Sequence, residues 1–286
     1  MAEILNPAGR FWAIDKIILA YFALMGALLV VYWSSVPGAA ELLALHAAGA
    51  AFVVLAVKWQ GWASRLFRHW YPLLYVAFCY REMSILIPAI RRTDADQVLA
   101  KLDHALWHAN PTVWLERIQA PPLTEFLQIV YSLFIPAVLF VALRFWLRKD
   151  YAAFRYYAFL IATGFLVSYM GYLLVPARGP RFVLNDLQHA PLRGLWVFGL
   201  LQSTLDRLEH VTYDCFPSGH TELAILACWG SRRISHGFGR LYVAYTVCMV
   251  FATVYLRYHY TVDVAAGALL ALVLMFATPA LYRELS

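Results

Sequence analysis

The sequence predicts an all-α integral membrane protein, a multispan helical bundle of about eight apolar segments. Two observations predict this class. Of the 286 residues, 62% are hydrophobic and only 14% are charged, whereas a soluble domain carries about 25% charged residues. The aromatic share is 16%, which suits the Trp and Tyr belts found at both membrane interfaces.

The apolar segments are long enough to give several spans of about 20 residues each. They cover residues 17–33, 40–57, 70–90, 123–147, 154–175, 220–230, 241–256 and 260–281. The sixth is short for a full span. The first follows a polar stretch, residues 1–16, without a small-residue cleavage pattern, so we expect a retained span and not a signal peptide. No internal repeat or linker is evident, which predicts one membrane domain over residues 1–286, with two N-terminal spans in 1–69.

The net charge of +6 indicates basic cytoplasmic loops and not a nucleic-acid partner. With a cytoplasmic N-terminus, thirteen Lys and Arg residues fall in cytoplasmic segments and nine in the opposite ones. The positive-inside rule therefore favours two cytoplasmic termini. It also places residues 176–219 and 257–263 together on the extracytoplasmic side. A bacterial inner membrane is the compartment we expect, although a eukaryotic endomembrane would give the same charge bias.

Residues 91–122 are too polar for a span. Leu99, Leu102 and Leu106 recur at helical spacing after Asp94 and Asp96, either of which can cap a helix. We expect an extracytoplasmic interfacial helix there, followed by a re-entrant turn near Trp114. His104 and His108 have a metal-ligand spacing but lack a third ligand, so two interfacial histidines are the simpler interpretation. In the third apolar segment, Arg81 and Glu82 have either a structural role or a place near the site.

Four cysteines occur without a C-x-x-C pair, which suggests neither a disulfide framework nor a zinc site. Polar residues that could bind a ligand or take part in catalysis gather instead at three points of the predicted extracytoplasmic face. The first is a Pro/Gly turn after the fifth segment that carries Arg178 and Arg181. Guanidinium groups match phosphate oxygens bidentately. Anchoring to lipid headgroups would explain these two arginines if they stood alone.

The second point is the stretch Pro217-Ser218-Gly219-His220 before the sixth apolar segment. Ser218 can cap a helix, Gly219 lets a ligand approach the backbone, and free amides at a helix start favour an anion. His220 can supply a proton near neutral pH. Alone, this short motif is weak evidence.

The third point is Arg257-x-His259-x-x-x-Asp263, which opens the last segment. His and Asp four residues apart lie on one face of a helix, where the carboxylate can fix the imidazole tautomer. Arg257 adds a third charge for a phosphate. Together the three points predict phosphoryl transfer with one histidine as nucleophile and the other as general acid.

The PSGH and His-x-x-x-Asp motifs, whose histidines lie 39 residues apart, resemble the second and third motifs of the type-2 phosphatidic acid phosphatase superfamily. The resemblance covers the last four apolar segments. It implies a six-helix catalytic core within residues 70–286 and a site at one membrane face. It implies that His259 forms a phosphohistidine, that Asp263 orients His259, that His220 protonates the leaving group, and that no metal or other cofactor is needed.

The chain departs from that family where a motif Lys and a motif Arg are replaced by Gly171 and Thr253. The wording around Asp214–Thr221 and Arg257–Val264 is closer to the inositol phosphorylceramide synthase and sphingomyelin synthase branch. That branch implies transfer of a phospho-headgroup from a membrane phospholipid to a lipid alcohol. Asp214 and Glu82 are further candidate site residues.

Two alternatives stay open. Water as the acceptor would make the protein a lipid-phosphate phosphatase of the phosphatidic acid or polyprenyl-pyrophosphate type. A non-catalytic transporter of anionic lipids would use the arginines without chemistry, but broken helices in corresponding halves are expected of such a protein. The sequence does not indicate the identity of the lipids or the oligomeric state.

Overall fold

Helices make up the computed structural model, which describes residues 10–59, 62–208 and 211–286. The only β-type pairing in these ranges is a single bridge between Ala177 and Asp214. The helices, with two 3-10 turns, are α2 (Ala13–Val31), α3 (Ala39–Lys58), α4 (Trp62–Ile90), α5 (Asp96–Trp107), α6 (Pro111–Trp114), η1 (Leu115–Ile118), α7 (Pro121–Ser132), α8 (Phe134–Leu147), α9 (Tyr151–Leu174), α10 (Pro180–Val183), η2 (Asn185–Leu187), α11 (Phe198–Leu208), α12 (Gly219–Ser231), α13 (His236–Tyr255) and α14 (Thr261–Leu285).

Six of these helices are long and apolar enough to cross a membrane, namely α2, α3, α4, α9, α13 and α14. The predicted class, an all-α integral membrane protein, is confirmed. The predicted fourth span is instead two helices, α7 and α8, bent by 48°. Pro136 explains the break, because it has no N–H to donate to the carbonyl of Ser132.

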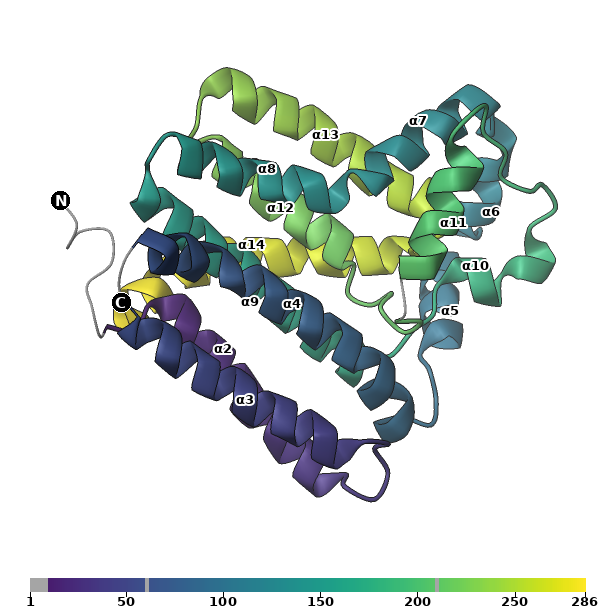
Figure 1. The fold of residues 1–286 in the computed structure, drawn as a ribbon. Helices are drawn as coiled ribbons and strands as arrows, with labels where there is room; N and C mark the ends of the chain where they lie inside the picture. Colours follow the sequence, from purple (N-terminus) through teal and green to yellow (C-terminus); the bar gives the residue numbers. More distant parts are fainter. Residues whose placement is uncertain (1–9, 60–61, 209–210) are drawn as a thin grey trace.

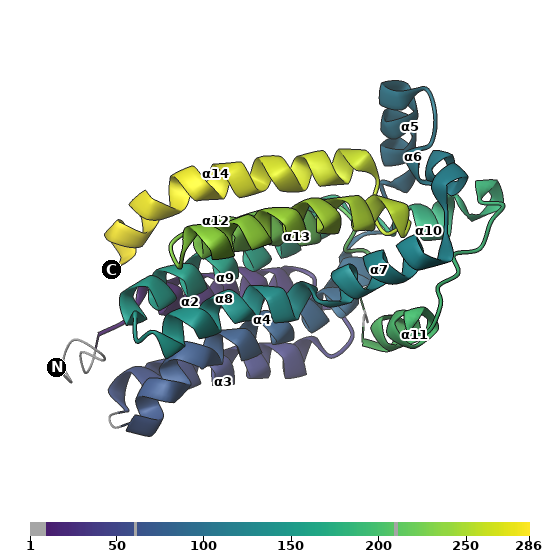
Figure 2. The same cartoon turned by 90° about the horizontal axis from the view of Figure 1, so that it is seen from above.

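The described chain has two distinct ends (Figure 1). The C-terminus and the start of α2 lie at one, which we call the terminal end. The short helices α5, α6, α10 and α11 gather at the opposite one, the loop end. Figure 2 shows the same separation from above. The described residues of 176–208, 211–219 and 257–263 thus meet at one end of the bundle. Of the N-terminal stretch assigned to the cytoplasm, residues 1–9 lie outside the described chain.

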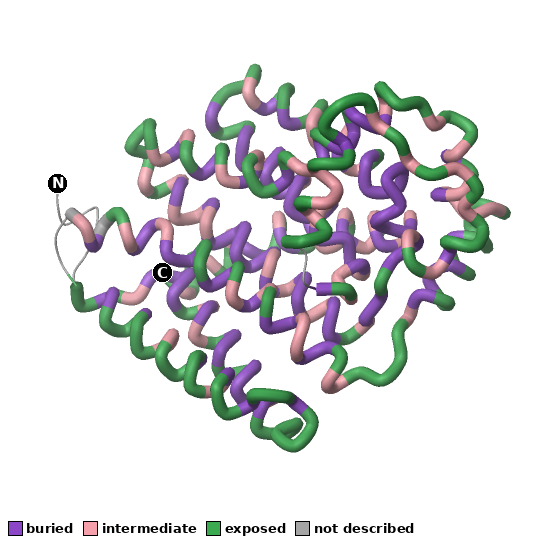
Figure 3. Tube along the Cα trace, turned by 45° about the vertical axis from the view of Figure 1, so that its right-hand side comes forward, coloured by how far each residue is buried: buried purple, intermediate pink, exposed green. Residues whose placement is uncertain are grey.

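The short helix α12 has 13 residues and is the centre of the bundle. It packs against α8, α9, α13 and α14, and Leu223, Leu226 and Ala227 are almost fully buried there. A second buried cluster joins α2, α4 and α9. Figure 3 shows buried residues in the middle of the bundle and exposed ones along α3 and the loops. Outward-facing Leu55, Leu74 and Phe276 fit contact with lipid.

The predicted interfacial helix is α5, and its apolar residues Val98, Leu102 and Leu106 are exposed. The expected capping by Asp94 or Asp96 is wrong, because the N-cap is Ala95. Asp96 is buried and accepts hydrogen bonds from the backbone N–H groups of Arg178 (2.7 Å) and Gly179 (2.8 Å). The carboxylate thus ties α5 to the loop after α9.

Candidate functional site

His220 and His259 face each other at the loop end of α12. His220 is the second residue of that helix, and Ser218 caps it as predicted, its Oγ accepting from the N–H of Thr221 at 3.3 Å. His259 lies in the turn between α13 and α14. Its Nε2 is 3.4 Å from Nδ1 of His220. The fold therefore brings together the two histidines that the sequence motifs singled out.

A backbone carbonyl sets the tautomer of His259. Its Nδ1 is 2.9 Å from the carbonyl oxygen of Cys215. Because a carbonyl can only accept, Nδ1 carries the proton and Nε2 keeps its lone pair. That lone pair points toward His220, where a phosphorus atom would have to bind for attack.

Asp263 lies farther from His259 than the sequence motif suggested. Its Oδ2 is 3.6 Å from Nδ1 of His259, which is too long for a hydrogen bond. The reason is that His259 precedes α14 and does not share a helical face with Asp263. Oδ2 instead accepts from the N–H of Tyr260 at 2.9 Å and from the Cys215 thiol at 2.8 Å.

Cys215 therefore touches both members of the His–Asp motif. Its carbonyl accepts from His259 and its thiol donates to Asp263. Burial, followed by the charge of Asp263, raises the pKa of the Cys215 thiol well above its usual value, so the thiol keeps its proton at neutral pH. One feature of the sequence could have indicated this role: Cys215 lies inside a polar segment, next to Asp214.

The atoms Cys215 Sγ, His259 Nδ1 and Asp263 Oδ2 also lie within 4.8 Å of one another. They are the one group in the described ranges with a metal-ligand arrangement. In the structure a hydrogen bond joins Sγ to Oδ2, and Nδ1 is bound to the carbonyl oxygen of Cys215. His104 and His108, the pair with metal-ligand spacing, are both exposed.

Aromatic rings hold His220 in place. Tyr131 stacks on it with ring centroids 4.6 Å apart, and Phe134 lies at 4.5 Å. The other face of the stack continues from Tyr131 to Tyr258 at 4.2 Å and an angle of 7°. The Arg181 guanidinium lies 4.7 Å from the Tyr258 ring. The sequence did not indicate that these rings contact His220, because aromatic residues in an apolar segment are usually part of the hydrophobic core.

The three predicted phosphate-binding arginines have different surroundings. Arg178 is exposed, with its guanidinium 5.4 Å from the Phe182 ring. Arg181 forms an ion pair with Asp206 at 3.0 Å, and both side chains are partly exposed. The adjoining Gly179 has φ +98, and a Cβ there would lie 2.6 Å from the carbonyl oxygen of Tyr258, so glycine is needed for the turn to approach the His259 segment.

Arg257 has partners that the sequence did not suggest. Its guanidinium donates to Glu116 at 2.9 Å, to Gln188 at 3.1 Å and to the carbonyl of Ala190 at 2.5 Å. Burial lowers the pKa of Arg257, and the charge of Glu116 opposes that change. In this structure Arg257 thus holds the loop after η2 against η1.

The remaining predicted residues also differ in their surroundings. Asp214 accepts from the Tyr80 hydroxyl at 2.6 Å, and burial raises the pKa of its carboxyl. Glu82 pairs with His46 of α3 at 3.0 Å, which corresponds to the structural role considered for it. The amides of Gly219 and His220, at the start of α12, have no acceptor among the described groups and are available to an anion.

An apolar cavity of about 390 Å³ leads away from this site between α4, α8 and α9. Asp214 and His220 line one part of it, and Trp70 and Phe154 line another. Leu205 and Leu208 of α11 contribute to its wall. Glu125 of α7 accepts from the N–H groups of Leu195, Trp196, Val197 and Phe198 and so fixes the start of α11.

Comparisons with known proteins identify the family of the chain. The family model of the PAP2 superfamily matches residues 97–277, a range that includes both histidine motifs. A PA-phosphatase related-family protein of Dictyostelium discoideum is 31% identical over 110 residues, which are 37% of this chain and 20% of that protein. The chain thus aligns with about a fifth of that relative. No solved structure matches. The resemblance to the synthase branch has no support from these comparisons. The matched range covers more than half of the sequence, and the chain belongs to the PAP2 superfamily.

Proposed function

We propose that the protein is a metal-independent lipid phosphatase or phosphotransferase that works through a phosphohistidine. The observation that carries the proposal is the contact between Nε2 of His259 and Nδ1 of His220 at 3.4 Å. One imidazole presents a lone pair to the other across the gap, as a nucleophile and a general acid require. Membership in the PAP2 superfamily supports a phosphatase-type reaction on a lipid.

In the first step, Nε2 of His259 would bond to phosphorus as the bond from phosphorus to the leaving oxygen breaks. His220 would give its proton to that oxygen. In the second step, water or an alcohol would return a proton to His220 and attack phosphorus, and the P–N bond would break. The leaving oxygen departs opposite to His259, so the two rings must separate when a phosphate enters.

The anion would lie at the start of α12, where the amides of Gly219 and His220 are available and Ser218 caps the helix. Arg178 and Arg181 would approach it from the loop after α9 and stabilise charge in the transition state. Arg257 would contribute only after leaving Glu116, to which it is bound at 2.9 Å. The carbonyl of Cys215 would keep Nδ1 of His259 protonated, and the nearby carboxylate of Asp263 would help to orient the ring through the Cys215 thiol.

The apolar cavity beside His220 supports a lipid substrate, because a hydrocarbon chain could enter it while its phosphate stays at the histidines. Transfer of a phospho-headgroup to a lipid alcohol is the finer proposal. It rests on the motif wording around Asp214 and Arg257. Release of inorganic phosphate to water is the alternative. The charge bias favours an active site on the extracytoplasmic side, and a bacterial inner membrane is the compartment that we propose.

The central test is His259→Ala in the full-length protein. We expect turnover to fall by at least about 10³-fold, because the nucleophile is lost. A ³²P-labelled lipid donor should leave an acid-labile, base-stable label on the unaltered protein and none on the variant. Full activity in a folded His259→Ala protein would overturn the mechanism.

The acceptor is tested by adding ceramide or diacylglycerol to the purified protein with a labelled phospholipid. A new phospholipid that forms only with the added alcohol would support headgroup transfer. Inorganic phosphate that forms at the same rate without it would identify a phosphatase.

A further inference from the structure

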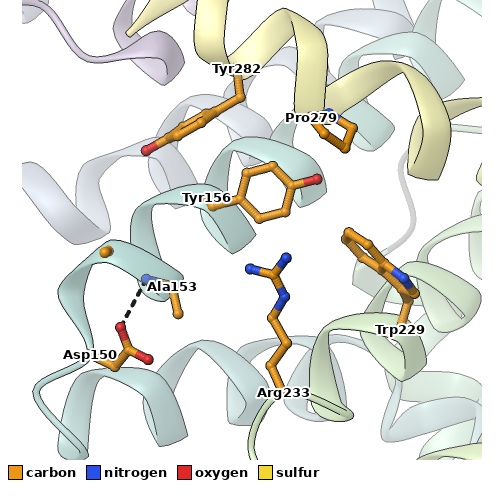
Figure 4. Close-up of a pocket in the computed structure, with 8 residues that line it drawn as sticks. Asp150, Ala153, Tyr156, Trp229, Arg233, Pro279 and Tyr282 are labelled. Atoms are coloured by element: carbon orange, nitrogen blue, oxygen red, sulfur yellow. Dashed lines mark hydrogen bonds between the residues drawn. The ribbon is translucent and has the colours of Figure 1, made fainter.

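A second pocket lies at the terminal end of the bundle, away from the histidines. It occupies about 540 Å³ between α9, α12 and α14. Figure 4 shows Tyr156, Trp229, Arg233 and Tyr282 around it. Trp229 is nine residues beyond His220 on α12, which corresponds to about 14 Å along a helix. Neither catalytic histidine lines the pocket, so the proposed reaction does not account for it.

Arg233 supplies the positive charge of the pocket. Its guanidinium lies 5.2 Å from the Tyr156 ring and 5.5 Å from the Trp229 ring. Figure 4 shows it pointing into the space between them. Among the described residues it has no carboxylate partner, although Asp150 lines the same pocket. Asp150 instead caps α9, with its Oδ1 accepting from the N–H of Ala153 at 3.1 Å.

The aromatic walls are fixed before any ligand arrives. Tyr156 packs edge-on against Tyr282 at 5.2 Å and against Trp229 at 6.0 Å. Its hydroxyl is also 3.1 Å from Oγ1 of Thr278. The first turn of α9, with its positive dipole end, borders the pocket at Ala152 and Ala153. A preformed cationic pocket of this kind suits an anion better than a neutral ligand.

An apolar stripe begins beside the pocket and runs along α14. Leu269, Leu272 and Phe276 recur at helical spacing and are 63%, 48% and 81% exposed, and the next turn places Pro279 in the pocket wall. A phosphate at Arg233 would therefore have an exposed apolar helix face beside it. This combination fits a phospholipid, whose acyl chains need such a surface, and not a free phosphate ion.

We propose that this pocket binds the phosphate group of an anionic phospholipid in the membrane leaflet at the terminal end. Arg233 pairs with the phosphate, the rings of Tyr156, Trp229 and Tyr282 contact the headgroup region, and the acyl chains lie along α14. Basic pockets between transmembrane helices bind anionic headgroups in this way. Trp and Tyr are enriched at the membrane–water interface, where the headgroups lie. The site is separate from the proposed catalytic site and does not depend on it.

The test measures lipid binding by the full-length protein in detergent by native mass spectrometry. Phosphatidylglycerol is the probe and phosphatidylcholine the neutral comparison. The His259→Ala background prevents any turnover of the probe. We expect phosphatidylglycerol to bind to Arg233→Gln about tenfold more weakly than to the parent, because a charge-assisted hydrogen bond is lost. The affinity of Arg233→Lys should lie between those of the parent and Arg233→Gln, since a lysine keeps the charge but cannot bind a phosphate through two parallel hydrogen bonds.

The matched control is Arg240→Gln, which removes another exposed charge, from the beginning of α13, but does not line the pocket. It should bind phosphatidylglycerol like the parent. Equal binding by the Arg233→Gln variant, or an equal loss in the control, would overturn the proposal. So would displacement of the lipid by millimolar inorganic phosphate, which would show that phosphate alone is the ligand. In the otherwise unaltered protein, Arg233→Gln should leave basal turnover unchanged.

Discussion

Arg257 at the loop end of the helical bundle and Arg233 at its terminal end have different kinds of partner. At the loop end, acids and bases pair with one another and with backbone groups. Arg257 binds Glu116, Glu125 accepts four backbone N–H groups, and Asp96 holds the loop after α9. At the terminal end Arg68 likewise pairs with Asp15 at 2.7 Å, but Arg233 is surrounded by aromatic rings and has no carboxylate partner among the described residues. The first arrangement fixes the positions of side chains, and the second leaves a cation available to a ligand.

Among substitutions that affect the loop end but not the terminal end, we expect the largest loss of turnover from His220→Ala. Turnover of a lipid phosphate should fall by about 10²- to 10⁴-fold, because the leaving oxygen loses its proton donor. With p-nitrophenyl phosphate, whose leaving group needs no proton, the loss should be much smaller. Steady-state rates on both substrates test this. His236→Ala, at the exposed start of α13, is the matched control. Equal losses on both substrates would contradict an acid role for His220.

A smaller effect is expected from Cys215→Ala, which removes the thiol but keeps the backbone carbonyl. We expect a loss of about tenfold in kcat, since one hydrogen bond to Asp263 is absent. Cys215→Ser, which retains a hydrogen-bond donor to Asp263, should restore most of the rate. An equal loss of kcat in the alanine and serine variants would contradict a role for the hydrogen bond to Asp263.

Sensitivity to soft metal ions should also distinguish the two ends. A thiophilic cation could sit about 2 Å from each of Cys215 Sγ, His259 Nδ1 and Asp263 Oδ2, as Zn²⁺ bonds require. Micromolar Cd²⁺ should inhibit the unaltered protein severalfold, and EDTA should reverse the inhibition. Cys215→Ser should be less sensitive, whereas Arg233→Gln should respond like the parent. EDTA alone should not lower activity, and its doing so would point to a metal requirement.

The sequence was sufficient for features that follow from local pattern. Apolar runs predicted the spans, and the two polar motifs predicted that His220 and His259 would meet. Features that depend on contacts between distant residues could not be foreseen. The Arg257 network uses Gln188 and Ala190, which lie in a loop without periodicity, and the Cys215 thiol reaches Asp263 across 48 residues. The break between α7 and α8 was foreseeable in principle from Pro136.

The short helix α12 has a consequence for the surroundings of the protein. Thirteen helical residues extend about 20 Å, whereas the hydrocarbon core of a bilayer is about 30 Å thick. The helix that carries His220 therefore cannot reach from one headgroup layer to the other. Either the histidines are recessed below the lipid surface or the bilayer thins around them. In both cases the proposed reaction would depend on the thickness of the host membrane, and a change in the acyl-chain length of the bulk lipid would change its rate without any contact with the site.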